Sequence, residues 1–143
     1  MIVSQLNHGI ALSPDGKTLF ASSLTNVYSW PYDAVAGTVG TKKTLIQNMK
    51  NGGHSTRTLW VARSNPDMLL VSRGSDGNID ASTAQITSGR SQIRAFSIAA
   101  LSTSPVDYTA GEVIGWGLRN SVGMSEDVST GGFVRYSHIY ILK

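Results

Sequence analysis

The chain has 143 residues, of which 41% are hydrophobic and only 15% charged, with 15 glycines and no cysteine. This length suits one domain, and the recurring apolar runs exclude a disordered chain. The formal charge of +3 is small and scattered, which excludes the basic stripe of a nucleic-acid-binding surface. Without cysteine there is no disulfide, no cysteine-ligated zinc and no cysteine nucleophile.

The chain contains no run of about 18 apolar residues, so we expect no membrane span. Its first residues, MIVSQLNH, lack the basic and apolar regions of a signal peptide. These features leave the localisation of this chain unknown.

A hairpin is the first predicted element. Ile10-Ala11-Leu12 leads into the turn Ser13-Pro14-Asp15-Gly16, and Thr18-Leu19-Phe20-Ala21 leads out of it. Proline presets φ for the first central turn position, and Asp-Gly favours a tight reversal. Further strands are predicted at 27–30 and 43–46, whereas 31–33 and 39–41 are expected to be connections.

A second hairpin follows the same outline. It has strands at 58–62 and 68–72 around the turn Ser64-Asn65-Pro66-Asp67, and another strand is predicted at 92–96. Residues 74–91 form a long polar segment between strands, and a loop of that length is usually functional.

The two proline turns stand about 50 residues apart, and a third copy of the outline begins near residue 117. A period near 50 is typical of a β-propeller blade of four strands. The sequence therefore predicts an all-β fold, with residues 1–133 forming two to three blades of a propeller and residues 134–143 an atypical tail. A closed ring needs about 4–8 blades, so we expect open edges with exposed apolar surface.

Two short clusters contain the residues suited to chemistry. In Asn51-Gly52-Gly53-His54-Ser55-Thr56-Arg57, the glycines give the backbone freedom to bring His54 close to a ligand. An imidazole can act as a general base for alcohol oxidation, although a loop histidine is also a common surface residue. Arg57 either fixes a carboxylate or forms an ion pair.

The second cluster is Gly115-Trp116-Gly117-Leu118-Arg119-Asn120. The planar guanidinium of Arg119 suits carboxylates and quinone oxygens, and Asn120 offers a donor and an acceptor. The alternative is an arginine tied to backbone carbonyls. Asp76-Gly77-Asn78-Ile79-Asp80 spaces oxygen atoms as calcium loops do, but it lacks the EF-hand glutamate, so a turn capped by its own side chains is the alternative.

The segments GGHSTRTL, NPDMLLVSRGSDGNID and IGWGLRNSVGMSEDVSTGG resemble the soluble glucose/sorbosone dehydrogenase family, and more closely its fungal pyranose dehydrogenases. The resemblance runs from about Leu6 to Gly132 and covers around a third of a typical family domain. It implies a six-bladed propeller that binds pyrroloquinoline quinone (PQQ) and calcium and oxidises a sugar hydroxyl by hydride transfer. It also implies His54 as catalytic base, Arg119 and Asn120 as cofactor-binding residues, secretion, and an electron acceptor such as a cytochrome or haem domain.

The chain departs from the family after Gly132. The family's calcium-binding segment is not present, so no metal ligand is assigned here, and 134–143 looks like intron read-through or a shifted frame. We therefore expect this chain alone to show little or no dehydrogenase activity. Two other functions stay open: a non-catalytic propeller fragment that binds a partner, and a lactonase-type hydrolase using Asp107, Glu112, Glu126 and Asp127.

Overall fold

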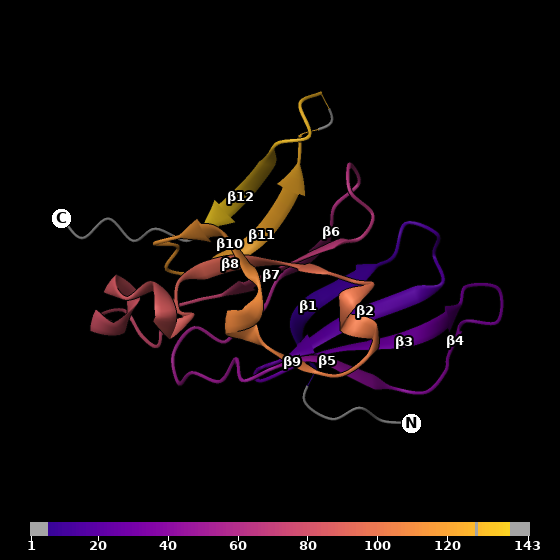
Figure 1. Ribbon diagram of the computed structural model, residues 1–143, viewed down its shortest axis with the longest axis horizontal. Coiled ribbons are helices and arrows are strands. Elements are labelled where there is room, and N and C mark those ends of the chain that lie inside the picture. Colours follow the sequence, from indigo (N-terminus) through magenta and orange to yellow (C-terminus); the bar gives the residue numbers. More distant parts are fainter. Residues whose placement is uncertain (1–5, 128, 138–143) are drawn as a thin grey trace.

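Residues 6–127 and 129–137 are described by the computed structural model, and they form three β-sheets without an α-helix (Figure 1). The first sheet has the order β1-β2-β3-β5-β9, with β4 paired to β3. The second has the order β10-β8-β7-β6, and the third pairs β11 with β12. No helix among these residues is long and apolar enough to cross a membrane.

The strand bounds follow the sheets. The first sheet contains β1 (Leu6–Leu12), β2 (Thr18–Ser23), β3 (Val27–Asp33), β4 (Thr38–Val39), β5 (Lys43–Gln47) and β9 (Val106–Asp107). The second contains β6 (Leu59–Val61), β7 (Met68–Arg73), β8 (Gln92–Ser97) and β10 (Glu112–Trp116), and the third contains β11 (Ser121–Glu126) and β12 (Phe133–Ser137). Four short 3-10 segments connect them: η1 (Ala81–Ala84), η2 (Ile86–Ser88), η3 (Ala100–Ser102) and η4 (Tyr108–Ala110).

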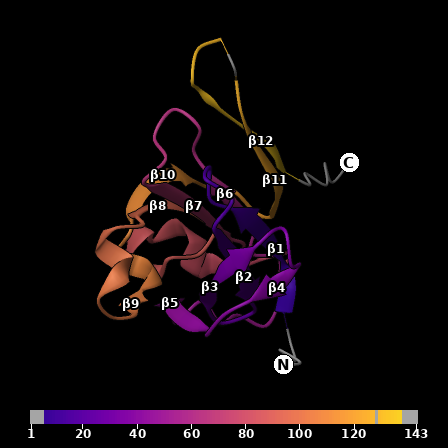
Figure 2. The ribbon, with the colours of Figure 1, turned by 90° about the vertical axis from the view of Figure 1, so that its right-hand side faces the viewer.

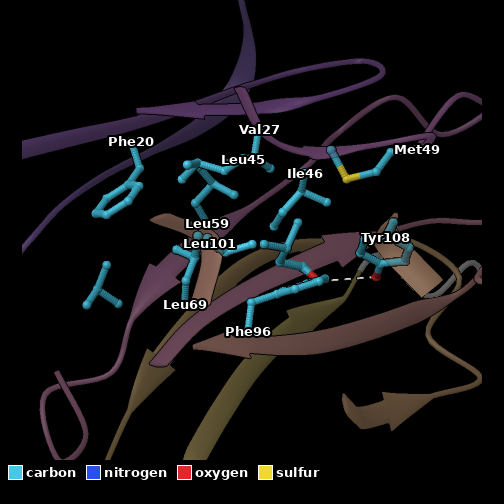
Figure 3. Packing of buried hydrophobic residues seen from close by; sticks show 12 residues of the cluster. Phe20, Val27, Leu45, Ile46, Met49, Leu59, Leu69, Phe96, Leu101 and Tyr108 are labelled. Carbon is cyan, nitrogen blue, oxygen red and sulfur yellow. Dashed lines mark hydrogen bonds between the residues drawn. The ribbon is translucent and has the colours of Figure 1, made fainter. Parts of the chain in front are cut away.

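The main core lies between the first and second sheets. Phe20 and Val27 from the first sheet pack with Leu69 and Phe96 from the second (Figure 3). Tyr108 is fully buried among them, and its hydroxyl donates to the carbonyl oxygens of Val71 at 3.2 Å and Gln92 at 3.0 Å. These two contacts join η4 to both β7 and β8. They also satisfy the buried hydroxyl, which would be costly to leave without a partner.

The second sheet is buried on both faces. Leu69 and Val71 of β7 point into the main core, while Leu70 between them joins a second cluster with Ile93 and Leu118. This alternation follows from the period of two along a strand. The second cluster supports the hairpin β11–β12, which extends away from the other two sheets (Figure 2).

The two predicted hairpins are confirmed. β1 and β2 pair antiparallel across the 13–16 turn, where Gly16 has φ of +71°, and β6 and β7 pair across the second proline turn. The predicted connections at 31–33 and 39–41 are wrong in part, because β3 continues to Asp33 and pairs with β4. Pro31 has no N–H to donate, but it still contributes to the sheet by its carbonyl oxygen, which accepts from the Gly40 N–H at 2.8 Å.

β10 is a strand that the sequence analysis did not anticipate. No strand was predicted at the cluster that begins at Gly115, but Gly115 and Trp116 pair with Ile93 and Gln92 of β8. Residues 134–137, placed in the atypical tail, continue β12 and pair with β11. Residues 138–143 of that tail lie outside the described residues.

Candidate functional site

Three connections meet at one end of the second sheet. They are the loop before β6, which carries His54, the segment that follows β7 from Gly74 onward, and the link between β10 and β11, which carries Arg119 and Asn120. β6 and β7 are antiparallel neighbours, so the start of one lies beside the end of the other. The link enters β11 next to β6, where Thr58 Oγ1 donates to the Ser121 carbonyl oxygen at 3.0 Å.

Gly74 is the point where the two clusters come together. A Cβ atom at this position would lie 2.7 Å from His54 Cβ, 2.8 Å from the Arg119 carbonyl oxygen and 3.4 Å from Asn120 Oδ1. Real Cβ contacts are longer than the first two of these, so only glycine allows this approach. The structure thus brings all three predicted site residues to one place.

His54 is half-buried and is held by Ser75 through both its backbone and its ring. The His54 N–H donates to the Ser75 carbonyl oxygen at 3.1 Å. Its Nδ1 lies 2.9 Å from Ser75 Oγ and 3.2 Å from the Ser75 carbonyl oxygen. The ring orientation is therefore fixed from the Nδ1 side.

Arg119 and Asn120 are also half-buried and each meets one of the other two segments. Arg119 Nη2 donates to Asn78 Oδ1, and the Arg119 carbonyl oxygen accepts from the Ser75 N–H at 2.9 Å. Asn120 Oδ1 accepts from Thr56 Oγ1 at 2.5 Å. These contacts orient a cation and an amide next to the histidine.

Arg57 has a structural role that differs from both options considered from the sequence. It is fully buried and touches no carboxylate in the described part of the chain; it donates instead to the carbonyl oxygens of His54 at 2.9 Å, Thr56 at 2.7 Å and Met49 at 2.7 Å, and to Asn51 Oδ1. Burial, and next the positive charge of Arg73, lowers the pKa of Arg57 to about 10. The guanidinium stays charged at neutral pH and fixes the path of the His54 loop.

The segment 76–80 uses its oxygen atoms within the protein. Asp76 Oδ1 accepts from the N–H groups of Gly52 and Gly53, and these bonds, the Gly52 bond first, lower the pKa of Asp76. Arg90 lies 3.1 Å from Asp76 and 3.0 Å from Asp80. The geometry favours the alternative of a side-chain-capped turn over a calcium loop.

The glycines before His54 serve a different purpose from the one expected. A Cβ at Gly53 would lie 2.4 Å from the Asp76 carbonyl carbon and from the Gly77 nitrogen, so this glycine is required by close packing of two loops. Left-handed backbone, by contrast, is recorded at neither Gly52 nor Gly53.

No group of three or more histidine or acidic side chains gathers in residues 6–127 and 129–137. These residues therefore contain no cluster of acidic side chains that could hold a calcium ion. The same finding weighs against the hydrolase alternative, which needs converging carboxylates: Glu126 accepts from the backbone of Arg63 and Ser64, and Asp107 from Asn48 and Thr109.

Several residues of the site were not identified from the sequence. Thr56 and Asn78 stand in segments singled out from the sequence but were given no role in this site, and no motif distinguishes Gly74 or Ser75. The one signal that pointed to three of them was the long polar segment 74–91 directly after a buried strand.

Comparisons with known proteins bear on this arrangement. Residues 1–137 match the model of a family described as TrAA12-like. The PQQ-dependent sugar dehydrogenase of Hypocrea jecorina (strain QM6a) is 47% identical over 131 residues, which are 89% of this chain and 30% of that protein. The PQQ-dependent pyranose dehydrogenase of Coprinopsis cinerea is 43% identical over 126 residues, which are 87% of this chain and 17% of that protein.

Solved structures of related proteins also superpose closely on this chain. The calcium structure of the Trichoderma reesei Carbohydrate-Active Enzymes Family AA12 superposes with a TM-score of 0.89 at 45% identity, covering 93% of this chain and 34% of that one. The holo form of the pyranose dehydrogenase PQQ domain from Coprinopsis cinerea gives a TM-score of 0.89 at 41% identity, covering 93% and 33%. The chain therefore spans less than a third of the curated relatives' length and about a third of each solved domain.

Proposed function

The chain belongs to the TrAA12-like family, and from this premise we propose that it carries part of the active site of a PQQ-dependent sugar dehydrogenase. The observation that carries the proposal is the meeting of His54, Arg119 and Asn120 around Gly74. The relatives named above are PQQ-dependent sugar and pyranose dehydrogenases. Their names supply the substrate class, a sugar, and the cofactor.

The architecture that goes with this function is two to three blades of a six-bladed propeller. Two four-stranded antiparallel units, β1-β2-β3-β5 and β6-β7-β8-β10, follow one another along the chain, and β11–β12 begins a third. The first strand of the second unit, β6, contacts both β1 and β11. First strands that adjoin in this order support an arrangement of successive blades.

The residues around Gly74 fit PQQ, a quinone that carries carboxylates. Arg119 brings a positive charge with a planar set of donors, and Asn120 brings an amide that Thr56 orients. PQQ, when bound, would supply the two-electron oxidant for the sugar hydroxyl. His54 takes the proton of the sugar hydroxyl as the carbonyl forms, and Arg119 stabilises negative charge that develops nearby.

Calcium does not fit the described residues in the same way. Asp76 and Asp80 are occupied by backbone N–H groups and Arg90. We therefore assign no part of the chemistry of this chain to calcium. With about a third of a domain present, we propose that the 143 residues alone turn over little or no sugar.

A chimeric enzyme tests the proposal. Residues 6–132 replace the matching segment of the Hypocrea jecorina enzyme, and dye-linked sugar oxidation is measured with PQQ and calcium. We expect retained turnover, a loss of kcat of at least about 100-fold in His54→Ala, and weaker PQQ binding in Arg119→Ala. Arg63→Ala is the matched control for Arg119→Ala, since the side chain of Arg63 is exposed. A folded chimera that binds PQQ and is unaffected by His54→Ala would disprove the assignment.

A second candidate function is a non-catalytic module that binds another chain through its open edge. Ile10 and Leu12 on β1 are 68% and 43% exposed, and exposed apolar strand residues favour association. Size-exclusion chromatography separates the two: a defined oligomer that binds no PQQ supports the module.

A further inference from the structure

We propose that Ser75 is a positioning residue that sets the tautomer of His54, keeping the ring proton on Nδ1 and leaving Nε2 as the basic atom. The hydrogen-bond argument is independent of what the protein does. Its catalytic consequence rests on the proposed function, because a base for the sugar hydroxyl needs a nitrogen without a proton.

The Ser75 hydroxyl has one proton, and the structure shows where it goes. Ser75 Oγ lies 2.6 Å from the Gly77 carbonyl oxygen and 3.4 Å from that of Arg119. Two oxygens 2.6 Å apart share a proton, and a carbonyl has none to give. The Ser75 proton therefore lies between Oγ and Gly77, and the lone pairs of Oγ remain for other donors.

This placement decides the role of His54 Nδ1. The nitrogen lies 2.9 Å from Ser75 Oγ and 3.2 Å from the Ser75 carbonyl oxygen, and both atoms now act only as acceptors. A bare nitrogen there would face two lone pairs, so Nδ1 carries the hydrogen. Histidine in water prefers its proton on Nε2, and the surroundings of His54 reverse this preference.

Of the two acceptors, the hydroxyl matters more. The Ser75 carbonyl oxygen already accepts from the His54 N–H at 3.1 Å and from Asn51 Nδ2 at 2.9 Å. These two bonds use its two lone pairs. The shorter bond to Nδ1 comes from Ser75 Oγ, so a change of the side chain alone affects the ring.

Ser75 is well suited to hold a ring in place, because it is only 3% exposed and its N–H is bonded to the Arg119 carbonyl oxygen. One residue thus joins His54 to the chain segment that carries Arg119. We infer that the position of the imidazole relative to Arg119 is transmitted through Ser75.

Long-range ¹H–¹⁵N correlation spectra of the 143-residue protein test the proposal directly. The chain has three histidines, and the His54 signals are assigned by their loss in His54→Gln. At about pH 8.5, where an ordinary imidazole is neutral, we expect the ¹⁵N shifts of His54 to show Nδ1 protonated and Nε2 bare. An Nε2-protonated ring in the wild-type protein overturns the proposal.

Variants identify the source of the effect. Ser75→Ala should change the ratio of tautomers by about fivefold toward Nε2–H, the worth of one hydrogen bond, and Ser75→Thr should restore the wild-type ratio. Ser121→Ala is the matched control: Ser121 is also 3% exposed, but its hydroxyl has no partner among the described residues. An unchanged ratio in a folded Ser75→Ala protein overturns the assignment to Ser75, and if that variant does not fold, the wild-type spectrum decides.

These measurements require neither PQQ nor turnover. A chimera inactive toward every sugar would remove the proposed function but leave the tautomer result standing. A ring protonated on Nε2 would remove the role of Ser75 but leave the family assignment intact.

Discussion

Thr56 and Asn120, which lie in different connections, are joined side chain to side chain by a hydrogen bond of 2.5 Å from Thr56 Oγ1 to Asn120 Oδ1. The bond fixes which end of the amide faces the His54 loop. Together with the hydrogen bond from the Ser75 N–H to the Arg119 carbonyl oxygen, it connects the three segments around Gly74. A substitution in one segment should therefore change the side-chain positions in the others.

Thr56→Val tests this link, because it removes the hydroxyl at nearly constant volume. In the chimeric enzyme we expect weaker PQQ binding by about fivefold, as one oriented hydrogen bond is lost, and Thr56→Ser should restore it. Titration of PQQ absorbance measures both. Equal affinities for the valine and serine variants would contradict a role of Thr56 in orienting Asn120.

Gly74→Ala should destabilise the protein and disturb the site. The added methyl overlaps His54 Cβ and the Arg119 carbonyl oxygen, and overpacking of this kind costs about 1–3 kcal/mol. Gly77→Ala is the control from the same segment, since its Cβ meets no atom closer than 3.7 Å. Urea unfolding measures the free energy of unfolding of both variants. Equal values would show that the loops around Gly74 move apart to accommodate the methyl group without loss of stability.

Arg57→Ala should lower the free energy of unfolding by about 3 kcal/mol or more. The variant leaves the carbonyl oxygens of Met49, His54 and Thr56 without a donor, and each buried unsatisfied group costs about 1–3 kcal/mol. Arg63→Ala, at an exposed position, should change stability by less than about 0.5 kcal/mol. A loss no larger than that of the control would mean that water replaces the guanidinium.

The lowered pKa of Asp127 should make the stability of the β11–β12 turn depend on pH. Hydrogen bonds from Ser129 and Thr130, the Ser129 hydroxyl first, lower the pKa of Asp127 from 3.8 to about 2. Because the folded pKa is the lower one, the stabilisation is fully present above pH 3.8 and is lost as the pH falls through about 2. The amide shifts of Ser129 and Thr130 should titrate near that lower value and not titrate in Asp127→Asn; a midpoint near 3.8 would speak against the capped turn.

Ile10→Lys should reduce self-association. Ile10 is 68% exposed on β1, and a charge on an exposed strand opposes pairing with another chain. Sedimentation velocity at several concentrations should give a smaller average mass for the variant. Val35→Lys, in the exposed loop between β3 and β4, is the control and should leave the mass unchanged.

Local patterns were sufficient for the strands with clear turn chemistry. Pro14 and Gly16 specify the first hairpin because each restricts or permits one backbone conformation, independent of the rest of the chain. β10 escaped detection because Gly115, near the end of Glu112–Trp116, weakens the strand signal, and pairing with β8 makes this segment a strand. Residues 31–33 were expected to be a connection, although Pro31 lies in β3 and its carbonyl oxygen accepts from the Gly40 N–H.

The sequence alone determined the chemical types of the site, an imidazole at position 54 and a guanidinium and an amide at 119 and 120, together with the all-β class and the family resemblance. These follow from residue identity and short-range spacing. Only the tertiary structure decided that the three residues meet at Gly74, that Arg57 is buried among carbonyl oxygens, and that Ser75 supports the histidine. The physical reason is that serine and glycine carry little information of their own, and their roles arise from which distant segments the sheets bring within hydrogen-bonding distance.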